Sequence, residues 1–391
     1  MEVAIGVFGA LAAVLGHLAI TVWLFNRAHA RPWRRKIVKA FEKLLLLASL
    51  IISLLLAWQL LQAATASDLW PRSSLLLQIY SVTCWLTALA AIPLWVVPKL
   101  WERTPAALLS NDTTSVHVLE RTAERPLNGV AAKLLFHFPG NEILRLGIHT
   151  KTIQLPRLPA ELSGLRIAHL SDLHMTGQLG KAFYDVVVDE TNALAPDLVV
   201  ITGDILEKVK CLPWIMPTLG RLRAREGKYF VLGNHEQRLP EAEELRAALT
   251  EADLIDLGSR CMSISLRGVE VTLAGTEVPW FGTSPEMPVL CGSDVARPTP
   301  FRILLSHSPD EFFWAQAQGI DLMLAGHTHG GQIRLPYIGA VVAPSNYGFR
   351  FAGGLYHQGP TVLHVSRGLA GIQPIRLNCP PEIALLVLMP A

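Results

Sequence analysis

Five short segments of this 391-residue chain carry carboxylate, amide and imidazole side chains, the groups that proteins use to bind metal ions. These side chains supply oxygen and nitrogen ligands without a thiolate, a set that suits Mn, Fe, Zn or Co better than Ca or Mg. Seven ligands are too many for one ion, so they predict two divalent metal ions that share a bridging carboxylate. The candidate metal ligands are Asp172, His174, Asp204, Asn234, His307, His327 and His329.

A pair of metal ions is suited to the hydrolysis of a phosphate ester or a phosphoanhydride. Two ions about 3.5–4 Å apart stabilise the attacking and the leaving oxygen of an in-line displacement, and a water between them becomes the nucleophile near neutral pH. A histidine can protonate the departing oxygen, and His235, beside Asn234, is the candidate for this catalytic role. The sequence leaves the substrate-binding residues unknown. Arginines pair with phosphate oxygens, and the candidates for a phosphate clamp are Arg238, Arg334, Arg350, Arg367 and Arg376.

Each of the five segments follows a short apolar run, which predicts that the ligands meet at strand ends, where open α/β folds bind their ligands. Helical patterns at residues 182–194 and 241–252 lie between some of these runs, as expected for an α/β protein with buried sheets. The apolar runs that precede the segments are residues 165–170, 197–202, 229–232, 302–305 and 320–325. Later runs predict a second, partly antiparallel sheet, at residues 261–266, 269–274, 362–365 and 383–388.

The first hundred residues contain three apolar runs without Asp, Glu, Lys or Arg, at residues 3–25, 44–64 and 75–98. Each has the length of about 20 residues that a helix needs to cross a bilayer, so we expect three transmembrane helices; buried core helices are the alternative. Basic residues crowd the loop between the first two runs, whereas residues 65–74 hold one Arg and one Asp. The positive-inside bias therefore predicts a multi-pass cell-membrane protein whose catalytic domain is cytoplasmic.

The expected domains are a membrane anchor at residues 1–100, a juxtamembrane linker with a first strand at 101–160, and a catalytic domain at 161–391. Within the linker, the polar residues 110–114 indicate a loop, and residues 143–155 indicate a strand. Residues 130–138 indicate a helix that rests on the membrane surface or packs as an ordinary helix. The net charge of +2 is too small to predict a nucleic-acid partner.

The ordered segments Asp172-x-His174, Gly203-Asp204, Gly233-Asn-His-Glu236, His307 and Gly326-His-Thr-His329 closely resemble the motifs of the calcineurin-like metallophosphoesterase superfamily. The resemblance covers roughly residues 163–391. It implies an α-β-β-α sandwich of two mixed sheets. It also implies that one metal is held by Asp172, His174, Asp204 and His329, and the other by Asp204, Asn234, His307 and His327. His235 would face the substrate phosphate and assist the leaving group.

Further segments look like membrane-associated bacterial phosphodiesterases of this superfamily, notably residues 158–174, 326–332 and 367–382. Related enzymes there cleave the pyrophosphate of UDP-diacylglucosamine. The resemblance implies a membrane-anchored, dinuclear metal-dependent phosphodiesterase or pyrophosphatase, with the bilayer and a phosphorylated small molecule or lipid as its partners. Trp280 and Phe281 would then form an apolar lip for an acyl chain or an ordinary packed loop. The alternative is a catalytically silent membrane sensor or scaffold whose phosphoesterase domain binds a phosphorylated ligand.

Overall fold

A computed structural model describes residues 2–65, 74–100, 105–124, 126–287 and 300–391 of the chain. The chain divides into two compact units, Met1–Arg103 and Thr104–Ala391. The second unit begins well before residue 161, where the sequence pattern placed the start of the catalytic domain. The physical reason is that the two strands of the expected linker are hydrogen-bonded into the larger sheet of the second unit.

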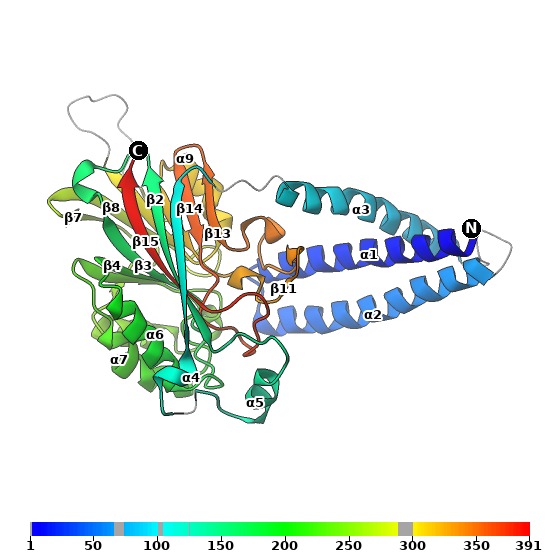
Figure 1. Cartoon of the computed structure of the whole chain (residues 1–391), viewed down its shortest axis with the longest axis horizontal. Helices are drawn as coiled ribbons and strands as arrows, with labels where there is room; N and C mark the ends of the chain where they lie inside the picture. Colours follow the sequence, from blue (N-terminus) through cyan, green and yellow to red (C-terminus); the bar gives the residue numbers. More distant parts are fainter. Residues whose placement is uncertain (1, 66–73, 101–104, 125, 288–299) are drawn as a thin grey trace. The chain divides into compact units, whose positions relative to one another are not determined.

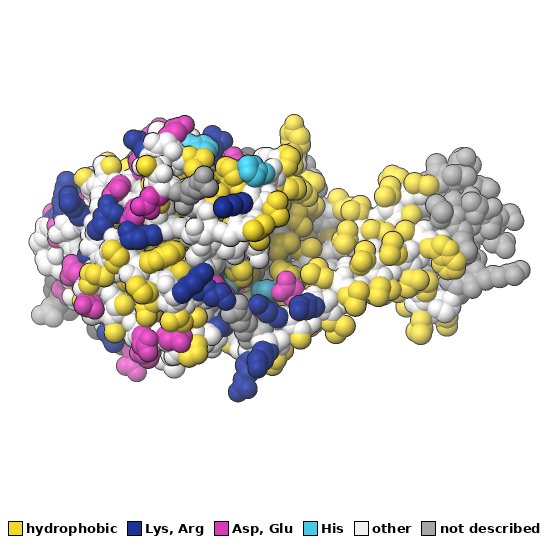
Figure 2. All heavy atoms as spheres, turned by 90° about the horizontal axis from the view of Figure 1, so that it is seen from below, with side chains coloured by type: hydrophobic (Ala, Val, Ile, Leu, Met, Phe, Trp, Pro, Cys, Tyr) yellow, Lys and Arg dark blue, Asp and Glu magenta, His cyan; other side chains and the backbone are white. Residues whose placement is uncertain are grey.

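The first unit consists of three long helices, as predicted: α1 (Glu2–His29), α2 (Arg35–Thr65) and α3 (Leu75–Leu100). All three are long and apolar enough to cross a membrane, over Val7–His29, Lys36–Gln59 and Leu75–Trp95. Figure 2 shows hydrophobic side chains spread along the outside of this unit, as expected for helices that face lipid. Most of the second predicted loop, residues 65–74, lies outside the described residues.

The helices of the first unit pack closely through small and polar side chains. A Cβ atom added to Gly16 of α1 would lie 1.8 Å from the carbonyl oxygen of Cys84 in α3, so the two backbones can approach only because this residue is glycine. His17, the titratable side chain noted within the three runs, is buried and lies 2.7 Å from the Tyr80 hydroxyl and 3.1 Å from the Ser49 hydroxyl. These contacts join α1 to both neighbours.

The second unit is built on two sheets (Figure 1). In the seven-stranded sheet, β3 to β6 run parallel, and β15 lies between β2 and β3, parallel to the first and antiparallel to the second. Its strands are, in spatial order, β1 (Leu108–His117), β2 (Arg145–Leu155), β15 (Glu382–Pro390), β3 (Leu165–Leu170), β4 (Leu198–Thr202), β5 (Gly227–Val231) and β6 (Ile255–Asp256).

The second sheet has six strands and is mixed, because β8, β9, β10 and β14 are parallel while β7 and β13 are antiparallel to their neighbours. Its spatial order is β13 (Gly354–Gln358), β14 (Thr361–Val365), β10 (Leu322–Ala325), β9 (Phe301–Ser306), β8 (Val269–Thr276) and β7 (Cys261–Leu266). A small hairpin stands apart from it, formed by β11 (Arg334–Leu335) and β12 (Gly339–Ala340).

The two sheets face each other across an apolar core, and helices cover their outer faces. Ile167 and Val200 of the first sheet and Leu305 of the second belong to one buried cluster. Strand residues alternate between faces, so Ala168 points the other way, toward Phe183 of α6. This arrangement confirms the predicted α-β-β-α sandwich. The helices of this unit are α4 (Val118–Arg121), α5 (Val130–Phe136), α6 (Lys181–Ala193), α7 (Ile215–Thr218), α8 (Ala242–Glu251) and α9 (Phe312–Ala317).

Two expectations about strands were wrong. Residues 110–114 are not a loop but part of β1, an edge strand paired only with β2. Most of β1 is exposed, so polar Ser, Asn and Thr side chains occupy it without burial, and the alternation that identifies a half-buried strand is missing. Residues 383–388 belong to β15 of the first sheet rather than to the second sheet.

Candidate metal centre

The seven predicted ligands lie together where the carboxyl ends of strands from both sheets meet. Asp172 and His174 follow β3, Asp204 follows β4, and Asn234 follows β5 in the first sheet. His307 follows β9, and the histidines at 327 and 329 follow β10 in the second sheet. All of them are buried except His329, which is partly exposed. Parallel neighbouring strands bring their ends to one edge, which explains how residues far apart in sequence converge.

The backbone at these positions is held in an unusual conformation. Asp172, His174, Asp204, His327 and His329 have φ angles between 42° and 71°, in the left-handed region that non-glycine residues seldom adopt. Each such residue costs on the order of 1–3 kcal/mol and persists where the surrounding structure enforces it. Five of the twelve non-glycine residues with a positive φ angle in the described part of the chain are thus candidate ligands, which supports a functional role for these loops.

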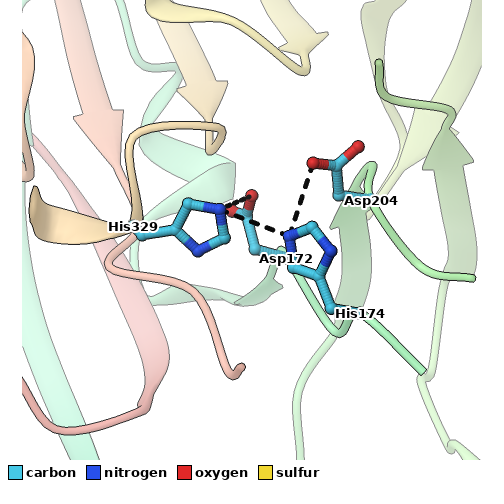
Figure 3. A group of neighbouring side chains, drawn as sticks. All are labelled: Asp172, His174, Asp204 and His329. Atoms are coloured by element: carbon cyan, nitrogen blue, oxygen red, sulfur yellow. Dashed lines mark hydrogen bonds and ion pairs between the residues drawn. The ribbon is translucent and has the colours of Figure 1, made fainter. Parts of the chain in front are cut away.

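The first candidate group contains Asp172, His174, Asp204 and His329 (Figure 3). One ligand atom from each residue lies within 4.8 Å of the others. The Nε2 atom of His174 is 3.5 Å from Asp204 Oδ2 and 3.3 Å from His329 Nε2. The Nε2 atom of His329 is also 3.5 Å from Asp172 Oδ1. Figure 3 shows the four side chains gathered at one place, with dashed lines joining neighbouring ligand atoms.

The second candidate group contains Asp204, His307 and His327, with Asn234 beside them. The Nε2 atom of His307 is 3.4 Å from Asp204 Oδ2, 3.1 Å from Asn234 Oδ1 and 3.1 Å from His327 Nδ1. The Oδ2 atom of Asp204 therefore belongs to both groups, which is the position required of a bridging carboxylate.

The donor set fits divalent metal ions. Backbone carbonyl groups hold two of the imidazole rings through Nδ1, the nitrogen that is not in the ligand group. His307 Nδ1 is 2.7 Å from the Thr202 carbonyl oxygen, and His329 Nδ1 is 3.2 Å from the Ala370 carbonyl oxygen. A carbonyl only accepts, so each Nδ1 carries a proton, and Nε2 is the atom left to bind a metal ion once it is deprotonated. This is the arrangement in which histidines ligate metals.

Electrostatics also favours cations at the centre. Burial would raise the pKa of the Asp204 carboxyl, but the neighbouring His307 and His235 hold that pKa well below its usual range. Burial would lower the pKa of His307, yet the charge of Asp204 raises it to about 9. Burial, together with the charge of Asp204, raises the pKa of Asp172. Two buried carboxylates in contact with one cluster thus need positive charge between them.

Two glycines of the motifs leave room for the ligands. A Cβ atom on Gly326 would lie 1.8 Å from the Ser171 hydroxyl and 2.6 Å from Asp172 Oδ2. A Cβ atom on Gly233 would lie 2.3 Å from Asp204 Oδ1. Neither glycine has a positive φ angle, so the requirement at these positions is space for a carboxylate rather than a left-handed backbone conformation.

The candidate catalytic residue, His235, lies beside both groups and is buried. Its Nδ1 atom hydrogen-bonds to the carboxylate of Glu207, and its Nε2 atom is 3.8 Å from Asp204 Oδ2 and 3.3 Å from Arg238 Nη1. The carboxylate only accepts, so Nδ1 is protonated. A guanidinium only donates, so Nε2 accepts. Burial lowers the pKa of His235, consistent with a neutral ring in this arrangement.

Sequence reasoning gave no role to two acidic residues of the site, Glu207 and Glu236, although Glu236 stands in the Gly233-Asn-His-Glu236 motif. Glu207 comes three residues after Asp204 in the same loop, and that spacing alone does not distinguish it from a solvated loop residue. Glu236 is fully buried and accepts hydrogen bonds from the backbone N–H groups of Asp204, Leu206 and Gly233, at 3.1, 2.9 and 2.7 Å. It also accepts from the Ile205 N–H at 2.5 Å, and it thereby holds the Asp204 loop against the Gly233 turn.

Four of the five candidate arginines can be distinguished by the contacts of their side chains. Arg238 reaches the site through His235. The side chain of Arg376 is fully buried and donates to the carbonyl oxygens of Arg367 and Ala370, so its role is structural. Arg334 donates to the Gly330 carbonyl oxygen at 3.0 Å, and Arg350 lies over the ring of Phe351 at 5.2 Å.

The segment around Trp280 forms one wall of the second ligand group. The Trp280 ring centroid is 4.9 Å from that of His327 and 5.3 Å from that of His307. The carbonyl oxygen of Trp280 accepts a hydrogen bond of 2.8 Å from Gln237 Nε2. Trp280 is thus packed against candidate ligands and buried, whereas Phe281 lies under the guanidinium of Arg246.

A buried chain of polar groups lies behind the centre, between the two sheets. Lys151 Nζ is 2.6 Å from Glu382 Oε1 and 2.7 Å from His364 Nε2. His364 continues to His169 at 2.9 Å, and His169 to the Thr202 hydroxyl at 2.9 Å. The Thr202 carbonyl is the group that orients His307. Burial lowers the pKa of His169 to about 3, so this ring stays neutral.

Comparison with known proteins agrees with the fold and the site. Residues 165–331 match the calcineurin-like phosphoesterase family. The metallophosphoesterase YkuE of Bacillus subtilis is 30% identical over 242 residues, which cover 61% of this chain and 83% of that protein. The UDP-2,3-diacylglucosamine pyrophosphatase LpxG of Chlamydia trachomatis is 27% identical, over 59% of this chain and 86% of LpxG. A bovine transmembrane protein with a metallophosphoesterase domain is 34% identical, over 61% of this chain and 57% of that protein.

This chain belongs to the calcineurin-like metallophosphoesterase family. Its second unit is a metal-dependent phosphoric ester hydrolase domain, joined in one chain to three helices that support association with a membrane.

Proposed function

We propose that this protein is a membrane-anchored phosphodiesterase or pyrophosphatase that works with two divalent metal ions. One ion would bind to Asp172, His174, Asp204 and His329. The other would bind to Asp204, Asn234, His307 and His327. The observation that carries the proposal is the position of Asp204 Oδ2, 3.5 Å from His174 Nε2 on one side and 3.4 Å from His307 Nε2 on the other.

When bound, the two ions would polarise the phosphoryl group and provide a nucleophilic water. The protein's own residues complete the chemistry. His235 Nε2 faces the ligand groups and is unprotonated at the start, so it would take up the proton that the attacking water releases and pass it to the departing oxygen, while Glu207 accepts from Nδ1 and stabilises the imidazolium form. Arg238, at 3.3 Å from the same Nε2 atom, would contact a non-bridging phosphate oxygen.

For the substrate, we favour a phosphate ester or anhydride of a lipid or nucleotide-lipid. Two observations support this choice: the three helices that can cross a membrane, and the similarity to LpxG, whose name identifies a nucleotide-linked diacylated sugar as its substrate. We place the catalytic unit in the cytoplasm, because the basic residues between α1 and the middle of α2 favour that side.

The enzymatic proposal is tested with the full-length protein in detergent, loaded with Mn²⁺. Turnover of bis(p-nitrophenyl) phosphate and of p-nitrophenyl phosphate is compared for the wild type, Asp204→Asn and His235→Ala. We expect metal-dependent cleavage of the diester that falls at least 100-fold in both variants. A folded protein with two bound ions and no turnover of either ester would support the silent sensor or scaffold instead.

The orientation is tested with single cysteines at Ser74 and Thr113, probed in intact cells with a membrane-impermeant maleimide. We expect Ser74→Cys to react from outside and Thr113→Cys to react only after the cells are permeabilised. Reaction of Thr113→Cys from outside would reverse the proposed topology without touching the enzymatic proposal.

A further inference from the structure

The helix α5 presents apolar side chains to solvent. Val130 and Leu134 are four residues apart and therefore lie on one helical face. Their exposed fractions are 75% and 69%, and Phe138, just past the end of the helix, continues the row. Ala132, on the other side, is buried. The inward side also carries Phe136, which is partly buried against the core, so the helix is apolar on both its inward and its outward side.

The hairpin of β11 and β12 also exposes apolar side chains to solvent. Leu335 lies on β11, and Tyr337 at the turn is fully exposed. Ile372, in the loop before β15, is also exposed. Soluble proteins rarely gather large apolar side chains on one surface without a partner. We call the set Val130, Leu134, Phe138, Leu335, Tyr337 and Ile372 the apolar rim.

The parts of the apolar rim are joined by the segment around Leu377. Leu377 pairs through its backbone with Asn141, just after α5, and with Ile333, just before the hairpin. Figure 1 shows α5 and β11 at the same end of the second unit, opposite β7. The rim is also next to the candidate metal centre, because Arg334 donates to the carbonyl oxygen of Gly330, which follows His329. A molecule held at the rim would therefore lie close to the site.

The charged residues near the apolar rim indicate what kind of partner this surface contacts. Residues 126–141, 330–347 and 368–378, which supply the rim, contain no Asp or Glu, while Lys133 and Arg334 lie within them. Apolar side chains flanked by basic ones match the interface of a bilayer with anionic lipids. The short connection also limits how far the second unit can move from the membrane, because residues 101–107 are all that connect α3 to β1.

We propose that the apolar rim inserts into the lipid–water interface of the membrane in which α1, α2 and α3 are embedded, with Lys133 and Arg334 at the head groups. The rim would then present a lipid-linked phosphate to the metal centre directly from the bilayer. The presentation of a lipid-linked substrate rests on the proposed function, but insertion of the rim can be measured without any turnover.

The test uses the full-length protein in nanodiscs of phosphatidylcholine and phosphatidylglycerol. The photo-crosslinking amino acid p-benzoylphenylalanine replaces Leu134 or Tyr337 in the rim. Matched controls carry it at Met216 and Ile255, which are 44% and 41% exposed elsewhere in the second unit. A positive control carries it at Leu86 of α3, which is 63% exposed. After irradiation, lipid adducts are quantified by mass spectrometry.

We expect lipid adducts at Leu134 and Tyr337 at least ten times as abundant as at Met216 and Ile255, and close to those at Leu86. Adducts at Leu86 alone would overturn the proposal, as would crosslinks from the rim to a second copy of the chain. Activity toward bis(p-nitrophenyl) phosphate is measured on the same samples. Adducts without turnover would support insertion of the rim and reject the enzymatic proposal. Turnover without adducts would support the enzymatic proposal and reject insertion of the rim.

Discussion

The Nδ1 atom of His235 is hydrogen-bonded to the carboxylate of Glu207, and both side chains are buried beside Asp204. The contact fixes which ring nitrogen carries the proton and aims the other nitrogen at the ligand groups. A histidine held in this way is prepared for proton transfer, because the carboxylate stabilises the charged ring that forms when Nε2 binds a proton.

Replacing Glu207 with Gln is expected to impair catalysis while leaving the metals in place. The amide keeps the size of the side chain but removes the negative charge that supports the His235 imidazolium. We expect kcat for bis(p-nitrophenyl) phosphate to fall about 100-fold or more, with both metals retained in elemental analysis. Glu251→Gln, at an exposed position of α8, is the matched control. Unchanged kcat in Glu207→Gln would remove this residue from the proposed chemistry.

Gly326→Ala should disturb the first ligand group. The added methyl group would overlap the Ser171 hydroxyl and approach Asp172 Oδ2, so the carboxylate must move away from its partners. We expect the metal content of the purified protein to fall from two ions toward one. In the control Gly220→Ala, the methyl group would meet the flexible Met216 side chain at 3.1 Å, and metal content should stay at the wild-type value. Two ions in Gly326→Ala would show that the loop has room to relax.

Removal of the metals should lower thermal stability as well as activity. The ions bind the folded state, so their loss withdraws stabilisation that grows with the logarithm of the ratio of ion concentration to Kd. We expect a chelator to lower the Tm of the wild type by several degrees and to have a much smaller effect on Asp204→Asn, which lacks the shared ligand. Equal shifts in the two proteins would mean that Asp204 does not hold an ion.

The buried ion pair of Lys151 and Glu382 should contribute strongly to the free energy of unfolding at neutral pH. Glu382→Gln leaves the Lys151 ammonium buried without its charged partner, which typically costs about 3–5 kcal/mol. In a domain of this size that is a fall in Tm of roughly 10 °C. Lys151→Met combined with Glu382→Gln should restore much of the loss. The exposed Glu270→Gln serves as a control. Equal Tm values for the single and double variants would contradict the pairing.

The same pair has a defined pH dependence. Burial would raise the pKa of Glu382, but Lys151 and Arg367 hold it well below the ordinary value of 4.5. A lowered pKa in the folded state means that the stabilisation is present above pH 4.5 and is lost as the pH falls toward the folded-state pKa. The difference in Tm between the wild type and Glu382→Gln should therefore shrink below pH 4.5. A difference that is constant from pH 7 to pH 3 would contradict this assignment.

The sequence was most informative where apolar runs end in metal-binding side chains. The run at residues 165–170 is β3, and its following Asp172 and His174 lie where the strand ends predicted. Such strands are buried on both faces, so their composition alone marks them. The edge strand β1 was missed because its Ser, Asn and Thr side chains face solvent. Exposed polar residues occur both in loops and in edge strands, so the composition does not distinguish the two.

Contacts over long distances in the chain could not be predicted. Lys151 and His364 are 213 positions apart, and only the packing of the two sheets brings them together. Glu207 was overlooked for a related reason. A lone acidic residue in a loop is normally solvated, and its burial becomes visible only when the ring of His235 is placed over it.

The place of β15 in the first sheet has a consequence for how the protein is made. Glu382–Pro390 is the last of the described strands to leave the ribosome, yet it lies between β2 and β3. During translation β2 and β3 are both made before the strand that lies between them in the finished sheet. The loop that carries Asp172 and His174 follows β3 directly, so we expect the metal centre to reach its final form only after β15 has joined the sheet. Nascent chains with the helices already at the membrane would thus depend on the final strand, and on chaperones that shield open sheet edges until then.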